Sequence, residues 1–113
     1  MEKEEEFALK CKDGVVRIAF ADLEYVEVIN KTVFFHLVSG AVYEATAALA
    51  DFENELLARP EFVKSHRSYL VNLSCVQAVG VQCAVTKSGY NVPVSRQRRN
   101  QIQDAYVQFL NQA

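Results

Sequence analysis

The ten-residue stretch KSHRSYLVNL, Lys64 to Leu73, joins a cluster of polar side chains directly to a strand-forming run. Its first four residues all carry groups that can hydrogen-bond a phosphate or a base edge. The run from Tyr69 to Leu73 has the aromatic and branched residues typical of a buried strand. A strand anchored in a core holds the neighbouring side chains in fixed positions. The stretch therefore predicts a β scaffold that presents a recognition cluster.

The bulk composition indicates one ordinary folded domain. The chain has 113 residues, of which 50% are hydrophobic and 23% charged, and this is enough to build a core. We expect no membrane span, because no apolar run approaches the roughly 18 residues that a membrane helix needs. We expect no signal peptide, because no apolar segment follows the charged start. Three cysteines without metal-ligand spacing, Cys11, Cys75 and Cys83, indicate small buried side chains in a reducing cytoplasm. We expect residues 1–6 to be a charged tail or linker remnant, and residues 7–113 to form the domain.

Charge is distributed unevenly along the chain. The formal net charge is −2, but residues 1–60 hold six basic and twelve acidic side chains, whereas residues 61–113 hold six basic and two acidic ones. The two halves therefore carry −6 and +4. This split permits a basic face on an acidic protein.

Turn signals and alternating hydrophobicity predict a mainly β chain. Asp13-Gly14 and Ser39-Gly40 indicate hairpins, and Asn30-Lys31 breaks a strand-like run between them. Further strands are expected over 62–63, 69–73, 76–85 and 90–94. Two helices are expected, one from an N-cap at Thr46 to Pro60 and one from an N-cap at Ser95 to the C-terminus. The total is about eight to ten short strands and two short helices.

The sequence contains no arrangement typical of an enzyme. His36 and His66 are isolated from each other, and neither is paired with a nucleophile in a recognised motif. His36 lies within an apolar strand, where we expect a satisfied or edge-facing strand residue instead of a ligand. Two histidines and three scattered cysteines make a poor metal set. The four glycines are isolated, so no phosphate-binding glycine loop exists. We expect no catalysis, no metal and no cofactor.

A second basic cluster, Ser95 to Gln101, lies at the start of the last predicted helix. Three arginines there are unfavourable, because a helix N-terminus carries partial positive charge. A bound phosphate would remove the conflict by accepting bonds from both the arginines and the free N–H groups. The alternative is a solvated basic turn that faces Asp104 or the acidic first half.

Two ordered motifs resemble the LytTR DNA-binding domain family. They are HRSYLVN, His66 to Asn72, and PVSR, Pro93 to Arg96, and the upstream stretch from Phe20 to Gly40 is also similar to the first half of that family. The resemblance covers about residues 7–110. It implies a mainly β fold of small packed sheets with short helices, in which side chains on connections between strands enter DNA grooves.

The resemblance also implies roles for individual residues. Asn72 is expected to be structural, with side-chain bonds to the backbone. The expected base-contacting residues are His66, Arg67, Arg96, Asn30 and Lys31. The expected phosphate-contacting residues are Lys64, Ser68, Ser95, Arg98, Arg99 and Asn100.

The predicted function is sequence-specific binding of double-stranded DNA by a bacterial transcription regulator. Such a protein is either the output domain of a two-component response regulator, with a receiver domain upstream, or a stand-alone member. Paired direct repeats and a homodimer on DNA are the expected mode of binding. The alternative is a small β interaction module whose basic corner docks an acidic or phosphorylated partner. Single-strand or RNA binding would need exposed aromatic side chains, and we expect Tyr43, Tyr69 and Tyr90 in the core.

Overall fold

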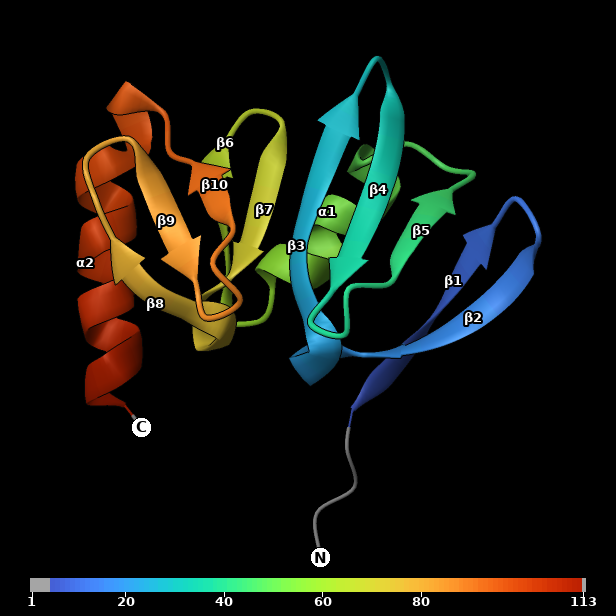
Figure 1. The fold of residues 1–113 in the computed structure, drawn as a ribbon, viewed down its shortest axis with the longest axis horizontal. Helices are drawn as coiled ribbons and strands as arrows, with labels where there is room; N and C mark the ends of the chain where they lie inside the picture. Colours follow the sequence, from blue (N-terminus) through green and yellow to red (C-terminus); the bar gives the residue numbers. More distant parts are fainter. Residues whose placement is uncertain (1–4, 113) are drawn as a thin grey trace, which may run out of the picture.

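The computed structural model describes residues 5–112, and within this range the chain is mainly β, as predicted. The described residues form ten short strands, two α-helices and three single-turn 3-10 helices, arranged as in Figure 1. The strands are β1 (Glu6–Cys11), β2 (Gly14–Ala19), β3 (Leu23–Ile29), β4 (Thr32–Leu37), β5 (Val42–Ala45), β6 (Phe62–His66), β7 (Tyr69–Asn72), β8 (Val76–Val79), β9 (Cys83–Thr86) and β10 (Asn91–Pro93). The helices are α1 (Ala50–Leu57), α2 (Arg99–Asn111), η1 (Phe20–Asp22), η2 (Leu73–Cys75) and η3 (Arg96–Arg98).

The strands form two antiparallel sheets. Seven strands pair in the order β2-β1-β5-β4-β3-β7-β6, and three pair in the order β10-β9-β8. In Figure 1 the small sheet and α2 lie beside the β6–β7 end of the large sheet, and α1 covers one face of the large sheet. No helix among residues 5–112 is long and apolar enough to cross a membrane.

Two adjacent strands, β3 and β7, join the two hydrophobic cores. Successive side chains of a strand point to opposite faces of its sheet. Val26 and Leu70 therefore pack in the core under α1, whereas Tyr25 and Val71 pack in the core shared with the small sheet and α2. The second core fixes the small sheet, and with it the β10–α2 connection, against the large sheet.

Both helix N-caps predicted from the sequence are wrong. Helix α1 begins at Ala50 with Leu49 at its N-cap, because the Thr46 hydroxyl instead donates to the carbonyl oxygen of Lys10 at 3.4 Å and continues the hairpin edge. Helix α2 begins at Arg99 after the single turn η3. Ser95 is at the N-cap position of η3, but its hydroxyl makes no capping bond, and the oxygen is buried without a partner among the described residues.

The polar cluster after Phe62 lies on a strand rather than in a loop. Strand β6 runs to His66, so only two residues form the turn before β7. Lys64 pairs with Leu70 and His66 with Tyr69, which makes Ser65 the extra residue of a β-bulge. Ser65 is fully buried, so this position faces the interior instead of a ligand.

Several structural expectations are confirmed. Asn72 is fully buried and its amide donates to the carbonyl oxygens of Phe20 and Leu23. The ring of His36 is satisfied, since Nε2 lies 2.7 Å from Oε1 of Glu27.

The remaining side-chain predictions are only partly correct. The three cysteines are free thiols, but only Cys75 is buried. Tyr90 is not in the core: it is 37% exposed and stacks on Tyr25 with ring centroids 4.4 Å apart. Tyr43 and Tyr69 are half-buried.

Candidate nucleic-acid interface

Three connections that carry predicted DNA-contacting residues lie at one end of the molecule. They are the β3–β4 turn, the β6–β7 turn and the β10–α2 junction, all at the top of Figure 1. Two backbone hydrogen bonds join them: Val28 N donates to Ser68 O at 2.9 Å, and Ser95 N donates to Ser65 O at 2.8 Å. The small sheet and the large sheet therefore contribute to one continuous surface.

The β3–β4 turn consists of Asn30 and Lys31. Both residues have positive φ, 49° and 70°, as a tight two-residue hairpin turn requires. Asn accepts this backbone conformation readily, whereas a lysine there is uncommon. Both side chains are exposed to solvent at the tip of the longest hairpin.

The β6–β7 turn presents Arg67 to solvent between two anchored neighbours. His66 is half-buried, and its Nδ1 accepts a hydrogen bond from Ser68 N at 3.1 Å. Its ring meets the ring of Tyr69 edge-on, with centroids 5.8 Å apart. The Tyr69 hydroxyl donates to Oε2 of Glu27 at 2.9 Å, and burial together with this carboxylate raises the pKa of Tyr69.

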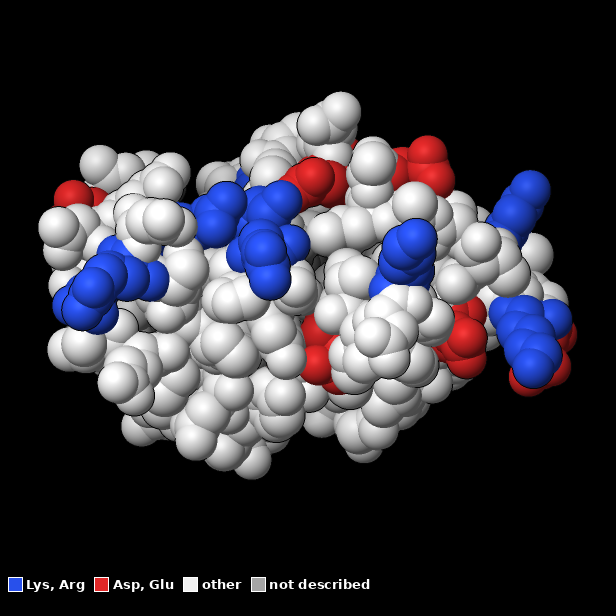
Figure 2. All heavy atoms as spheres, turned by 90° about the horizontal axis from the view of Figure 1, so that it is seen from above, with Lys and Arg blue, Asp and Glu red and all other residues white. Residues whose placement is uncertain are grey.

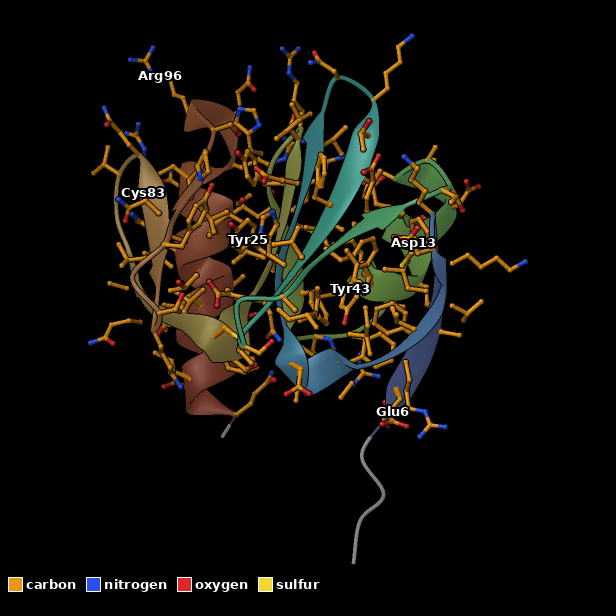
Figure 3. The ribbon with its side chains drawn as sticks, turned by 45° about the vertical axis from the view of Figure 1, so that its right-hand side comes forward. Glu6, Asp13, Tyr25, Tyr43, Cys83 and Arg96 are labelled. Atoms are coloured by element: carbon orange, nitrogen blue, oxygen red, sulfur yellow. The ribbon has the colours of Figure 1, made fainter. Side chains whose placement is uncertain are left out.

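The β10–α2 junction places one arginine in solvent and holds two others closer to the protein. Figure 3 shows Arg96 pointing away from the body at this end. Arg98 and Arg99 are half-buried, and Nε of Arg99 donates to Val81 O at 2.9 Å. Asn100 is exposed. The start of α2 has no side-chain cap and no acidic residue, so its first N–H groups and the arginines make this end electropositive.

Not every predicted contact residue is equally available. The Lys64 ammonium bonds to the carboxylate of Glu53 on α1 and is half-buried. The hydroxyl of Ser95 is buried without a partner among the described residues, and so is that of the adjacent Ser65. Lys64, Ser95 and Arg99 are therefore held within the domain, whereas Arg67, Arg96, Lys31 and Asn30 project into solvent.

The charge distribution matches this arrangement. Figure 2 views the same end from above and shows Lys and Arg side chains in a row along the long axis, with Asp and Glu mostly to either side. The protein as a whole carries −2, so the basic row is a local feature. A row of cations suits a polyanion such as the DNA backbone.

One residue beneath this surface was not identified from the sequence. Glu27 is 8% exposed and accepts hydrogen bonds from both Tyr69 on β7 and His36 on β4. It thus links β3, β4 and β7, three of the four strands that flank the two turns. The one feature of the sequence that pointed to Glu27 was the presence of an acidic residue within the mainly apolar strand β3. Among the described residues, no group of three or more His, Cys, Asp or Glu side chains is placed to hold a metal ion.

Residues 13–106 match the family model of the LytTr DNA-binding domain. The chain belongs to the LytTR family. This confirms the resemblance seen in the HRSYLVN and PVSR motifs. In an alignment of 83 residues, which covers 67% of this chain and 33% of the other protein, the chain is 34% identical to the sensory transduction protein LytT of Oceanobacillus iheyensis. Its fold matches a solved LytTr DNA-binding domain from Bacillus cereus with a TM-score of 0.75, at 24% identity, over 92% of this chain and 97% of the other.

Family membership settles the class of function. The chain is a LytTr DNA-binding domain, and the alternative of a module that docks an acidic or phosphorylated protein is not favoured. The basic end then has an evident ligand class.

Proposed function

We propose that this LytTR domain reads a specific double-stranded DNA site with the three connections at its basic end. The observation that supports this most is their attachment to one another by the Val28–Ser68 and Ser95–Ser65 hydrogen bonds. Elements fixed together in this way keep a constant spacing, which reading several base pairs of one duplex requires.

Base recognition is assigned to the exposed side chains. Arg67 and Arg96 each offer a planar guanidinium that can bind O6 and N7 of guanine together in the major groove. Of the two ring nitrogens of His66 only Nε2 is free to face a base, since Nδ1 is occupied by Ser68 N. Asn30 and Lys31 contact a further groove from the tip of the β3–β4 hairpin.

Phosphate contacts are assigned to the groups around these base readers. Arg98 and Asn100 lie beside the N-terminus of α2, where an anion gains from the free N–H groups. Lys64 and Arg99 contact phosphate only after exchanging their bonds to Glu53 and Val81. Ser68 and Ser95 complete the proposed set of phosphate-contacting residues.

The wider context of the domain is also a proposal. The chain spans about a third of the curated relative it matches, so a receiver domain upstream fits the remaining length. We propose that it acts in the cytoplasm as a transcription factor without catalytic activity, and that two copies bind paired direct repeats as a homodimer on DNA.

In vitro selection from random duplexes tests the proposal. The wild-type domain should enrich one sequence, and mobility shifts on it should show an affinity that falls steeply with salt. Arg17 is a matched control, because it is 81% exposed yet pairs with Glu6, which Figure 3 places at the opposite end from Arg96. Arg17→Ala should leave affinity unchanged, whereas Arg96→Ala should weaken binding by roughly ten- to one-hundred-fold. A selection in which no duplex sequence is enriched would contradict the proposal and would favour the protein-docking alternative.

A further inference from the structure

The β6–β7 turn is closed by a side chain rather than by the backbone alone. Nδ1 of His66 accepts the hydrogen bond of Ser68 N, and Ser68 O accepts that of Val28 N. Both backbone groups of Ser68 are thus occupied, one by the residue before Arg67 and one by the neighbouring strand. Arg67 sits inside this closed loop, with its own side chain exposed.

The hydrogen bond also determines which tautomer the imidazole adopts. A ring nitrogen that accepts a bond from an amide N–H carries no proton itself, so in neutral His66 the proton is on Nε2. The edge contact with Tyr69, whose hydroxyl is held by Glu27, fixes the orientation of the ring. The histidine is therefore supported from the core side and holds the turn from the solvent side.

We propose that His66 is a positioning residue that fixes the backbone of Arg67, and that base discrimination by Arg67 depends on the Nδ1 acceptor. This inference rests on the proposed function, because it assumes that Arg67 reads a base pair. A turn that is already closed loses less conformational freedom when the guanidinium binds a base. The affinity for the specific site is therefore raised, whereas the affinity for nonspecific DNA is not.

Two substitutions separate this role from a direct contact by His66. His66→Phe keeps an aromatic ring against Tyr69 but removes the acceptor. His66→Asn restores an acceptor for the N–H two residues later, as in an Asx-turn, but places no group where Nε2 would reach a base. Each is measured alone and together with Arg67→Ala, on the selected duplex and on a duplex of scrambled sequence, with thermal unfolding as a check on folding.

The expected results form a distinct pattern. His66→Phe should lower the preference for the selected over the scrambled duplex by about three- to ten-fold, the range for one lost hydrogen bond. His66→Asn should retain wild-type preference within about two-fold, and in the Arg67→Ala background His66→Phe should cause no further loss. In the free wild-type domain, a long-range ¹H–¹⁵N spectrum of the neutral imidazole should show the proton on Nε2.

Each contrary result has a separate meaning. Equal losses in the Asn and Phe variants, or a Phe effect that persists without Arg67, would show that His66 contacts DNA itself and would overturn the inference alone. A proton on Nδ1 would also overturn it, without reference to DNA. A wild-type domain that selects no sequence would overturn the proposed function and this inference together.

Discussion

Replacing Asn72 tests how the domain holds its recognition strand in place. Its amide nitrogen donates to Phe20 O at 3.2 Å and Leu23 O at 2.9 Å, and Oδ1 accepts from the backbone N and the hydroxyl of Ser74 at 2.9 and 2.6 Å. The side chain is fully buried. It therefore links the end of β7 to the start of β3.

The expected loss of unfolding free energy follows from the hydrogen bonds that each partner of Asn72 retains after Asn72→Ala. Phe20 O still accepts from Leu23 N, and Ser74 is exposed, so water can reach its donors. Leu23 O keeps only a weak contact with the Cys75 thiol at 3.9 Å. One poorly satisfied buried carbonyl and the lost cap of η2 together give a loss of about 3 kcal/mol.

Urea denaturation followed by far-UV circular dichroism measures this loss, and Ser74→Ala is the control with an expected change below about 1 kcal/mol. Asn72→Asp sharpens the test, because it preserves the shape but turns a carboxyl oxygen toward two carbonyl oxygens. The introduced carboxyl is favoured in its protonated form, so its folded-state pKa lies above its unfolded value. The stability of this variant should then be lost as pH rises and recovered as pH falls. A loss under about 1 kcal/mol for Asn72→Ala, or no pH dependence for Asn72→Asp, would show that these hydrogen bonds do not hold β7 to β3.

Three further predictions follow from individual side chains. Arg98→Ala should weaken binding to all duplexes alike and lower the slope of log K against log salt by about one, whereas Arg17→Ala should not change the slope; mobility shifts in a salt series measure both. Ser65→Ala removes a buried hydroxyl that lacks a partner among the described residues, so urea denaturation should show an unfolding free energy that is unchanged or raised. A loss above about 1 kcal/mol would mean that the hydroxyl makes a hydrogen bond in solution. Burial raises the pKa of Tyr25 and Tyr69, so the unfolded chain ionises first as pH rises. Unfolding free energy should stay constant up to about pH 10 and fall above it, and an unfolding free energy that stays constant at still higher pH would contradict this.

Local chemistry in the sequence predicted much of the fold. Both predicted hairpins form, although the first turn is Lys12-Asp13 with Gly14 already in β2, and the second spans residues 38–40. Asn72 bonds to the backbone, and Ile102 packs in the core shared by the small sheet and α2. These features depend on residues close in sequence or on a residue type with few alternatives. The helix caps failed because a hydroxyl at Thr46 or Ser95 has other partners or none in the tertiary structure.

Long-range pairing was beyond what the sequence could show. Nothing in it indicates that β3 lies between β4 and β7, or that β5 lies between β4 and β1. The backbone hydrogen bond between Ser95 and Ser65 is also a long-range pairing, and it joins the β10–α2 junction, which carries Arg96, to the end of β6 next to the turn that carries Arg67. The motifs identified the candidate contact residues, but only the fold shows that these residues lie at one end of the molecule.

We propose that Arg67 and Arg96 read different base pairs of one duplex from a rigid common surface. The most direct measurement compares wild type, Arg67→Ala and Arg96→Ala on every single-base-pair variant of the selected site. Each substitution should flatten the preference at its own position, by about 1–3 kcal/mol, and leave the other position intact. Profiles that stay unchanged in both variants, or that weaken uniformly at every position, would contradict the claim.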